Sequence, residues 1–409
     1  MKKLLGLLLV MTMAWPVAAN ADVLKNVELK GEIETIASDV NHNAMDLYNQ
    51  GTNFRVMAGL SAQLVEDVTA NVLFQYTDGW TGDTAGNSIQ NYADNVEVSE
   101  ANVVLSNLFD CFELTVGRQF YGEENSAVMY IGPNHFNAEG LKAPSIDAAK
   151  LTYADDVKAL TLIAGKIKDD DFSDSGWSVE DAALFGADFR MKFTDTLSAQ
   201  IYGYDIAHSK VYDEYGIRVE DEEGEFKHIG FYGAKVSFAP ESFLLSAEYT
   251  RDFNGKRLIK ESKDTGYMVK VDAAAKLEIV DVRGTFAYAN ENFYAFGNYT
   301  PGLLVGHVLG GDIWDYSMEG LRMWNLGFDY KLTDAWTFAL DGFIFQDRFA
   351  HHTETYEADL TAKYAHNEYV QLFAGIGYAK YGTDDGSDYN RMALGKDNVK
   401  GQIGMLINF

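Results

Sequence analysis

The chain has very little cysteine, little proline and few basic residues for its length. Its 409 residues include one cysteine, Cys111, and five prolines. A single thiol excludes an intrachain disulfide and a zinc site built from several cysteines. With 33 basic residues against 61 acidic ones, the formal net charge is −28, which excludes a nucleic-acid partner recognised through global positive charge.

The chain also lacks an apolar run long enough to span a membrane as a helix. The apolar stretch at residues 4–15 is about 12 residues long, whereas a spanning helix needs roughly 20. Lys2 and Lys3 precede this stretch and Ala19-Asn20-Ala21 follows it, which is the pattern of a secretory signal peptide with its cleavage site. We therefore expect residues 1–21 to be a cleaved signal peptide, in preference to a membrane anchor.

What the chain has instead is a repeated alternation of apolar and polar residues. In the segment 52–65, Phe54 and Val56 fall on one face and Arg55 falls on the other, and this period of two is typical of a β-strand. The pattern returns after short polar turns along nearly the whole chain, without a linker or low-complexity stretch. It predicts about 18 strands, or sixteen if the weak segment 148–153 does not form one.

Strands of about ten alternating residues, joined by short turns and longer loops, are the signature of a transmembrane β-barrel. The predicted fold class is therefore all-β, a transmembrane antiparallel up-and-down β-barrel of about 18 strands. Residues 22–409 are expected to form this barrel as a single domain. Eight short turns and nine longer loops would place both ends of the mature chain on the periplasmic side.

The last predicted strand ends on an aromatic residue. Ile403, Met405, Ile407 and Phe409 alternate with Gln402, Gly404, Leu406 and Asn408 up to the final position. This segment resembles the closing strand of bacterial outer-membrane β-barrels, in which a terminal Phe serves as an assembly signal. The resemblance implies a location in the bacterial outer membrane, contact with outer-membrane lipid, and recognition by the barrel assembly machinery through the strand ending at Phe409.

A second resemblance concerns the segment 112–119, Phe-Glu-Leu-Thr-Val-Gly-Arg-Gln. It resembles the strand that carries a Gly-Arg-Gln element in alginate-export-type outer-membrane porins, which implies an anionic saccharide as the solute. The alternation places Arg118 on the lipid-facing side, which an arginine should avoid at mid-bilayer. We therefore expect Arg118 at the outer rim, or turned inward by a bulge.

In such a barrel, the residues between the lipid-facing ones point into the lumen. Both signs of charge occur at these positions. Rows of opposite charge on facing walls would create a transverse field that filters solutes by charge and polarity. The candidate pore-lining residues are Arg55, Arg190, Lys192, Lys235, Lys270, Asp272, Asp281, Arg283, Asp329, Asp341, Glu357 and Asp359.

Two long connections are candidates to narrow this lumen. The connection from Tyr121 to about Ser145 is the third on the outer side, and in porins broadly the third such loop often folds inward; the alternative is an ordinary exposed loop. The connection 290–317 is too apolar for a freely solvated loop, and we expect it to pack into the barrel mouth or against another subunit. The candidate constriction residues of the third loop are Glu123, Glu124, Glu139 and Lys142.

The sequence gives no sign of catalysis or of a cofactor. The eight His residues are scattered, and no G-x-S-x-G, H-E-x-x-H or phosphate-binding loop occurs. The acidic clusters near residues 169–174, 220–225 and 384–388 do not match a calcium-binding loop and are expected to be solvated. We therefore predict neither an enzyme, nor a metal site, nor a cofactor.

The leading hypothesis is an outer-membrane porin for passive diffusion of small hydrophilic solutes, ions or saccharides through a mixed-charge lumen. The alternative is a structural or adhesive surface barrel with a plugged lumen, and a third hypothesis is a barrel hydrolase with a site on its loops. Assembly into a homo-oligomer is left open by the sequence.

Overall fold

The computed structural model describes residues 25–42, 49–79, 96–136, 141, 143–167, 179–180, 183–207, 210–211, 228–253, 265–290, 293, 297, 299, 301–303, 321–347, 354–380 and 397–409. The predicted signal peptide and the three acidic clusters lie outside these residues. Within them, no helix is long and apolar enough to cross a membrane.

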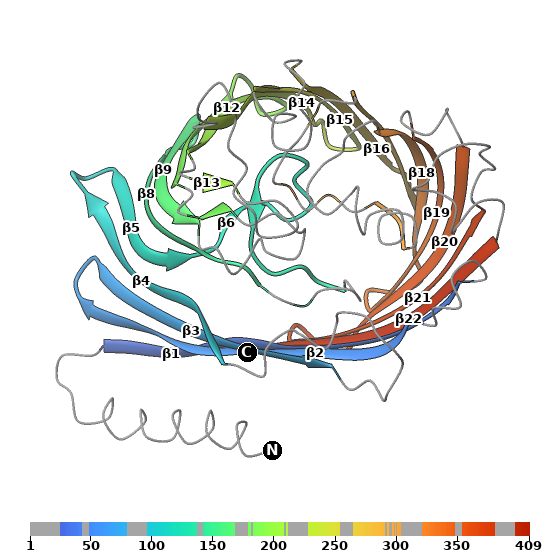
Figure 1. Cartoon of the computed structure of the whole chain (residues 1–409), viewed down its shortest axis with the longest axis horizontal. Helices are drawn as coiled ribbons and strands as arrows, with labels where there is room; N and C mark the ends of the chain where they lie inside the picture. Colours follow the sequence, from blue (N-terminus) through green and yellow to red (C-terminus); the bar gives the residue numbers. More distant parts are fainter. Residues whose placement is uncertain are drawn as a thin grey trace.

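Eighteen antiparallel strands form one closed sheet (Figure 1). Four short strands, β6 (Tyr121–Gly122) with β7 (Tyr130–Ile131) and β10 (Val179–Glu180) with β13 (Lys210–Val211), form two separate pairs. The strands of the closed sheet are β1 (Lys25–His42), β2 (Asn49–Val65), β3 (Val68–Gly79), β4 (Glu97–Leu108), β5 (Phe112–Gln119), β8 (Ile146–Ala154), β9 (Lys158–Ile167), β11 (Ala183–Lys192), β12 (Leu197–Ala207), β14 (His228–Phe238), β15 (Phe243–Phe253), β16 (Tyr267–Lys276), β17 (Val280–Ala289), β18 (Leu321–Lys331), β19 (Trp336–Asp347), β20 (Glu354–Ala365), β21 (Val370–Lys380) and β22 (Asp397–Asn408).

Each barrel strand pairs with the next one along the chain, and β1 pairs with both β2 and β22, which closes the ring. The weak segment 148–153 is part of a regular strand, β8, which pairs with β5 and β9. The predicted barrel of 18 strands is therefore confirmed, and the sixteen-stranded alternative is not.

On several strands, polar side chains point inward and apolar side chains point outward, the reverse of a water-soluble protein. On β20, Thr355, Glu357 and Asp359 are 6%, 3% and 2% exposed, whereas the alternating Tyr356 and Leu360 are 47% and 50% exposed. The same contrast recurs on β22, where Lys400 and Gln402 are 1% and 4% exposed and Ile403 is 64% exposed. Such an outer face requires an apolar environment, because water would penalise it.

Arg118 lies at the end of β5, one residue before the strand ends. Its guanidinium makes two hydrogen bonds of 2.8 Å to the carboxylate of Asp147 on β8 and a third, of 3.3 Å, to the carbonyl of Val98. The arginine thus lies next to the long connection that follows β5, as the rim interpretation expected.

Closure of the ring depends on a small residue on β1. The N–H of Gly31 donates to the carbonyl of Phe409 at 2.8 Å, and the N–H of Phe409 donates back at 2.9 Å. A Cβ on Gly31 would lie 2.3 Å from the carbonyl oxygen of Met57 and 2.9 Å from the ring of Phe409. The glycine is therefore required by the close approach of the two neighbouring strands.

We expect Gly31→Val to lower the free energy of unfolding by about 1–3 kcal/mol, the usual cost of overpacking. Gly401→Ala on β22 is the matched control, because a Cβ there would meet nothing within 4 Å. Urea unfolding of both variants in lipid vesicles measures the difference. Equal urea midpoints for the two variants would show that the close approach of the strands at Gly31 does not require a glycine.

Candidate functional site

The described part of the third loop, residues 120–136, 141 and 143–145, lies inside the barrel. Figure 1 shows its β6 strand within the ring of barrel strands. Glu123 Oε1 contacts Arg190 Nη1 on β11 at 2.5 Å, while the ring of Phe136 stacks on Phe373 of β21 with centroids 4.9 Å apart. Since β11 and β21 lie far apart in the strand order, a segment that contacts both must pass through the interior.

One part of the third loop is fixed by apolar packing. Ala127, Val128, Met129 and Ile131 are all at most 5% exposed. They belong to one buried cluster with inward side chains of many barrel strands, including Ile206, Ile229, Phe231 and Met268. Burial of these side chains removes apolar surface from water and stabilises this part of the loop against the wall.

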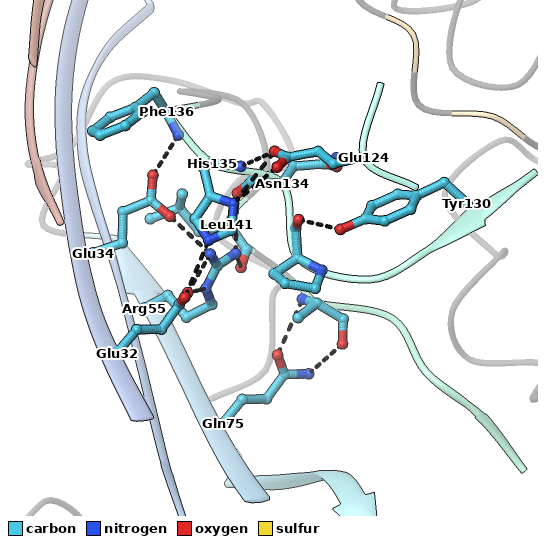
Figure 2. Close-up of polar contacts among 12 residues, drawn as sticks. Glu32, Glu34, Arg55, Gln75, Glu124, Tyr130, Asn134, His135, Phe136 and Leu141 are labelled. Carbon is cyan, nitrogen blue, oxygen red and sulfur yellow. Dashed lines mark hydrogen bonds and ion pairs between the residues drawn. The ribbon is translucent and has the colours of Figure 1, made fainter. Parts of the chain in front are cut away.

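The other part of the third loop is fixed by charge, in a cluster built around Arg55 of β2 (Figure 2). The Arg55 guanidinium contacts Glu32 Oε1 at 2.5 and 2.9 Å and Glu34 Oε2 at 2.8 Å, both on β1. Its Nη1 also donates to the loop carbonyls of Leu141, at 2.6 Å, and Asn134, at 3.2 Å. Arg55 and Glu34 have no exposed surface.

His135 joins the loop to the same carboxylates. Its Nε2 lies 3.1 Å from Glu32 Oε2 and its Nδ1 lies 3.3 Å from the Glu124 carboxylate. Burial alone would lower the pKa of His135, but the hydrogen bonds with Glu124 and Glu32 outweigh this effect and raise the pKa to about 9. The next residue, Phe136, donates its N–H to Glu34 Oε1 at 2.5 Å.

The pKa of His135 predicts a loss of stability at alkaline pH. Because the folded pKa is about 9 against an ordinary value of 6.5, the stabilisation is complete below about pH 6.5 and is lost as the pH rises through about 9. Glu124, Glu32, Glu34 and Arg55 are the charged groups that face this ring. We expect the urea midpoint of unfolding of the wild-type protein to decrease from pH 7 to pH 10 by more than that of a His135→Gln variant. Equal decreases in the two midpoints would contradict this prediction.

Two further wall residues hold the third loop by hydrogen bonds. The side-chain amide of Gln75 on β3 donates to the carbonyl of Ala143 at 3.2 Å and accepts from its N–H at 3.0 Å. Gln402 on β22 donates to the carbonyl of Phe136 at 3.4 Å. The loop is thus attached to β1, β2, β3, β21 and β22 on this side of the barrel.

Glu32, Glu34 and His135 have the spacing of a three-ligand metal site, since each offers an atom within 4.8 Å of the others. However, Arg55 Nη2 already lies between the two carboxylates, at 2.5 and 2.8 Å. The guanidinium therefore supplies the positive charge that a cation would bring to these carboxylates.

The structure brings several of the other predicted charged residues together as neighbouring pairs. Arg283 on β17 contacts Asp329 of β18 at 3.0 Å and, across that strand, Asp341 of β19 at 2.5 Å. The Arg283 side chain passes over β18 at Gly327, where a Cβ would lie 2.8 Å from Arg283 Cζ. Opposite charges are therefore paired locally here, which differs from the expected separation into rows on facing walls.

The remaining predicted wall residues are found in different surroundings. Lys270 pairs with Asp272 at 3.0 Å, and Lys331 lies 3.9 Å from Asp281. Among the described residues, Lys192 and Lys235 take part in none of the ion pairs found; Lys192 is exposed, and Lys235 is half-buried opposite Glu248. Of the predicted constriction residues, Glu123 and Glu124 are described, whereas Glu139 and Lys142 lie outside the described residues.

Some residues of the connection 290–317 that follows β17 also contact the interior of the barrel; the described ones are 290, 293, 297, 299 and 301–303. The N–H of Leu303 donates to Glu357 Oε1 at 2.7 Å and to Asp359 Oδ2 at 2.9 Å. Gly297 touches the third loop, because a Cβ there would lie 2.2 Å from the carbonyl oxygen of Ser126. The two inward segments therefore meet inside the barrel.

Sequence reasoning did not single out His135, Phe136 or Gln75. Glu32 and Glu34 share the period-two phase of inward residues, so the alternation alone predicts that both lie on the inner wall, as Arg55 does. The roles of His135 and Phe136 depend on contacts with strands about 100 residues away in the sequence. No local pattern reveals contacts of that kind.

No family model matches this sequence, and no curated protein does either. Among solved structures, the chain is similar to OccAB4 of Acinetobacter baumannii, with a TM-score of 0.64 and 12% identity over 95% of this chain and 100% of that one. It is also similar to the outer membrane protein OprD from Pseudomonas aeruginosa, with a TM-score of 0.59 and 12% identity over 96% of each chain. The chain is similar as well to Pseudomonas aeruginosa OpdK with vanillate, with a TM-score of 0.60 and 9% identity over 93% of this chain and 98% of that one.

At such low identity these similarities concern the fold alone. They support the porin fold that the sequence predicts, but they do not support the narrower resemblance to alginate-export-type porins. The chain has the fold of the OprD and Occ outer-membrane porins.

Proposed function

We propose that this protein is an outer-membrane porin through which small hydrophilic solutes diffuse passively. The observation that carries the proposal is the inversion of polarity: buried polar and charged side chains such as Arg55, Glu357 and Asp359 face inward, and large apolar side chains face outward. An 18-stranded barrel is near the size at which an aqueous passage remains. The porin structures with the same fold support this proposal.

The proposal includes the finer expectations from the sequence. The lumen carries both signs of charge at candidate pore-lining residues such as Arg190, Lys270 and Asp281, and the third loop forms the constriction. The outer face contacts outer-membrane lipid, and the strand ending at Phe409 is recognised by the assembly machinery. The vanillate in the OpdK structure makes small aromatic carboxylates a reasonable first solute class to test, besides saccharides.

A plugged barrel with a structural or adhesive role is the second candidate. The observation in its favour is that the two inward segments meet at Gly297 and Ser126, with a buried apolar cluster around them. A plugged barrel would carry no ionic current, so one measurement separates the two functions.

We expect the refolded barrel to give discrete ohmic steps in planar bilayers. With 61 acidic against 33 basic residues, its reversal potential in a salt gradient should show a modest cation preference. Anion selectivity would show that the inward Arg and Lys residues dominate the passage. Absence of steps from correctly folded protein would favour the plugged barrel.

A further inference from the structure

We propose that Arg55 is a positioning residue, the centre of an electrostatic latch that holds the third loop against one wall and thereby sets the open cross-section of the channel. The latch consists of Arg55, Glu32, Glu34 and His135. The effect on cross-section rests on the proposed channel function, whereas the effect on the loop does not.

The first step is that the Arg55 guanidinium is buried and directs its N–H donors at groups of the protein itself. The side chain is 0% exposed, and its three nitrogens contact Glu32, Glu34 and the two loop carbonyls. A guanidinium presents its five N–H donors in a fixed planar fork. Arg55 therefore binds the loop and cannot attract a solute in this structure.

The second step is that the wall half of the latch is formed by adjacent strands. Glu34 of β1 is the register partner of Arg55 on β2, and Glu32 lies two residues away on the same face. This part is positioned by the barrel itself. The third loop completes it with the carbonyls of Asn134 and Leu141, the N–H of Phe136 and the ring of His135.

The third step is that a single nitrogen of Arg55 donates hydrogen bonds to two separate backbone carbonyls of the loop. Arg55 Nη1 donates both to Asn134 and to Leu141, which are seven positions apart in the sequence. Loss of this donor therefore removes one hydrogen bond at each of the two points at once. The apolar part of the loop around Val128 and Met129 belongs to a different cluster and would stay in place.

The fourth step concerns the direction in which the loop would move. The latch attaches the loop to β1 and β2, and nearby contacts attach it to β3, β21 and β22. When the latch is weakened, only these nearby contacts hold this part of the loop against the wall. A gap between the loop and β1 and β2 can then open, which would raise the ionic conductance.

The test uses the full barrel refolded in lipid and two variants. Arg55→Lys keeps the positive charge but loses the planar set of five N–H donors of the guanidinium. The triple variant Glu32→Gln, Arg55→Met, Glu34→Gln removes the three charges together and leaves none of them buried alone. The matched control is Asp329→Asn, Arg283→Met, Asp341→Asn, which removes one Arg and two Asp from a different part of the wall.

The first readout is hydrogen exchange at the amides of Phe136 and Ala143. We expect exchange at least tenfold faster in the triple variant, an intermediate increase in Arg55→Lys, and unchanged exchange at these two amides in the control. Unchanged exchange in the triple variant would overturn the latch, whether or not the barrel conducts.

The second readout is single-channel conductance. We expect it to rise about twofold in the triple variant and less in Arg55→Lys, since conductance follows the cross-section of an aqueous passage. Faster exchange with unchanged conductance would overturn the effect on cross-section. A wild-type barrel that carries no current would overturn the proposed channel, while the exchange result would still decide on the latch.

Discussion

Replacing residues 123–141 by a short Gly-Ser linker should raise the single-channel conductance several-fold. The third loop occupies the interior between β11 on one side and β1, β2 and β21 on the other. The barrel wall does not depend on it for hydrogen bonding, because β5 and β8, on either side of the loop, already pair with each other from Phe112 to Gln119. The ring should therefore close without the loop and leave a wider passage.

The control for this deletion removes the same number of residues, partly from the connection 80–95 and partly from 381–396. Correct folding of each variant is checked by the resistance of the barrel to unfolding in dodecyl sulfate below its heat-denaturation temperature. An unchanged conductance after deletion of the third loop would mean that the constriction lies elsewhere, with the connection 290–317 as the next candidate.

The single substitution Arg55→Met should lower the free energy of unfolding by about 3–5 kcal/mol, the usual cost of removing one partner of a buried ion pair. Glu32 and Glu34 are 8% and 0% exposed, so their carboxylates would be left in the interior without the guanidinium. Neither carboxylate can regain its hydration there unless the loop moves away.

The triple variant Glu32→Gln, Arg55→Met, Glu34→Gln should cost clearly less than Arg55→Met alone, because no charge remains without its partner. Urea titration in vesicles, followed by tryptophan fluorescence, gives the free energies of unfolding of the wild type, the single variant and the triple variant. Equal losses for the single and triple variants would show that packing around the Arg55 side chain, not its charge, stabilises the cluster.

The barrel could be predicted from the sequence because the signal for each strand is local. Alternation with a period of two needs only ten neighbouring residues, and it identified even the short β8. The closing strand was equally visible, since its apolar positions alternate up to Phe409. Strand register then follows from the short turns, which leave little choice of pairing.

The candidate site could be predicted only in outline. Alternation gives Arg283, Asp329 and Asp341 the same phase, but their pairing depends on the register of three strands and on the space that Gly327 leaves. An inward path of the third loop was one of two alternatives that its position in the chain suggested. Its attachment points were not, because His135 and Phe136 reach partners about 100 residues away.

The third loop is fastened in two unlike ways, and the two fastenings should respond to different conditions. The contacts of Val128 and Met129 are apolar, so cooling weakens them, whereas the contacts of His135 are ionic and weaken at alkaline pH. Cold and alkali would therefore loosen opposite ends of the same segment. Each end would then serve as the hinge about which the other swings.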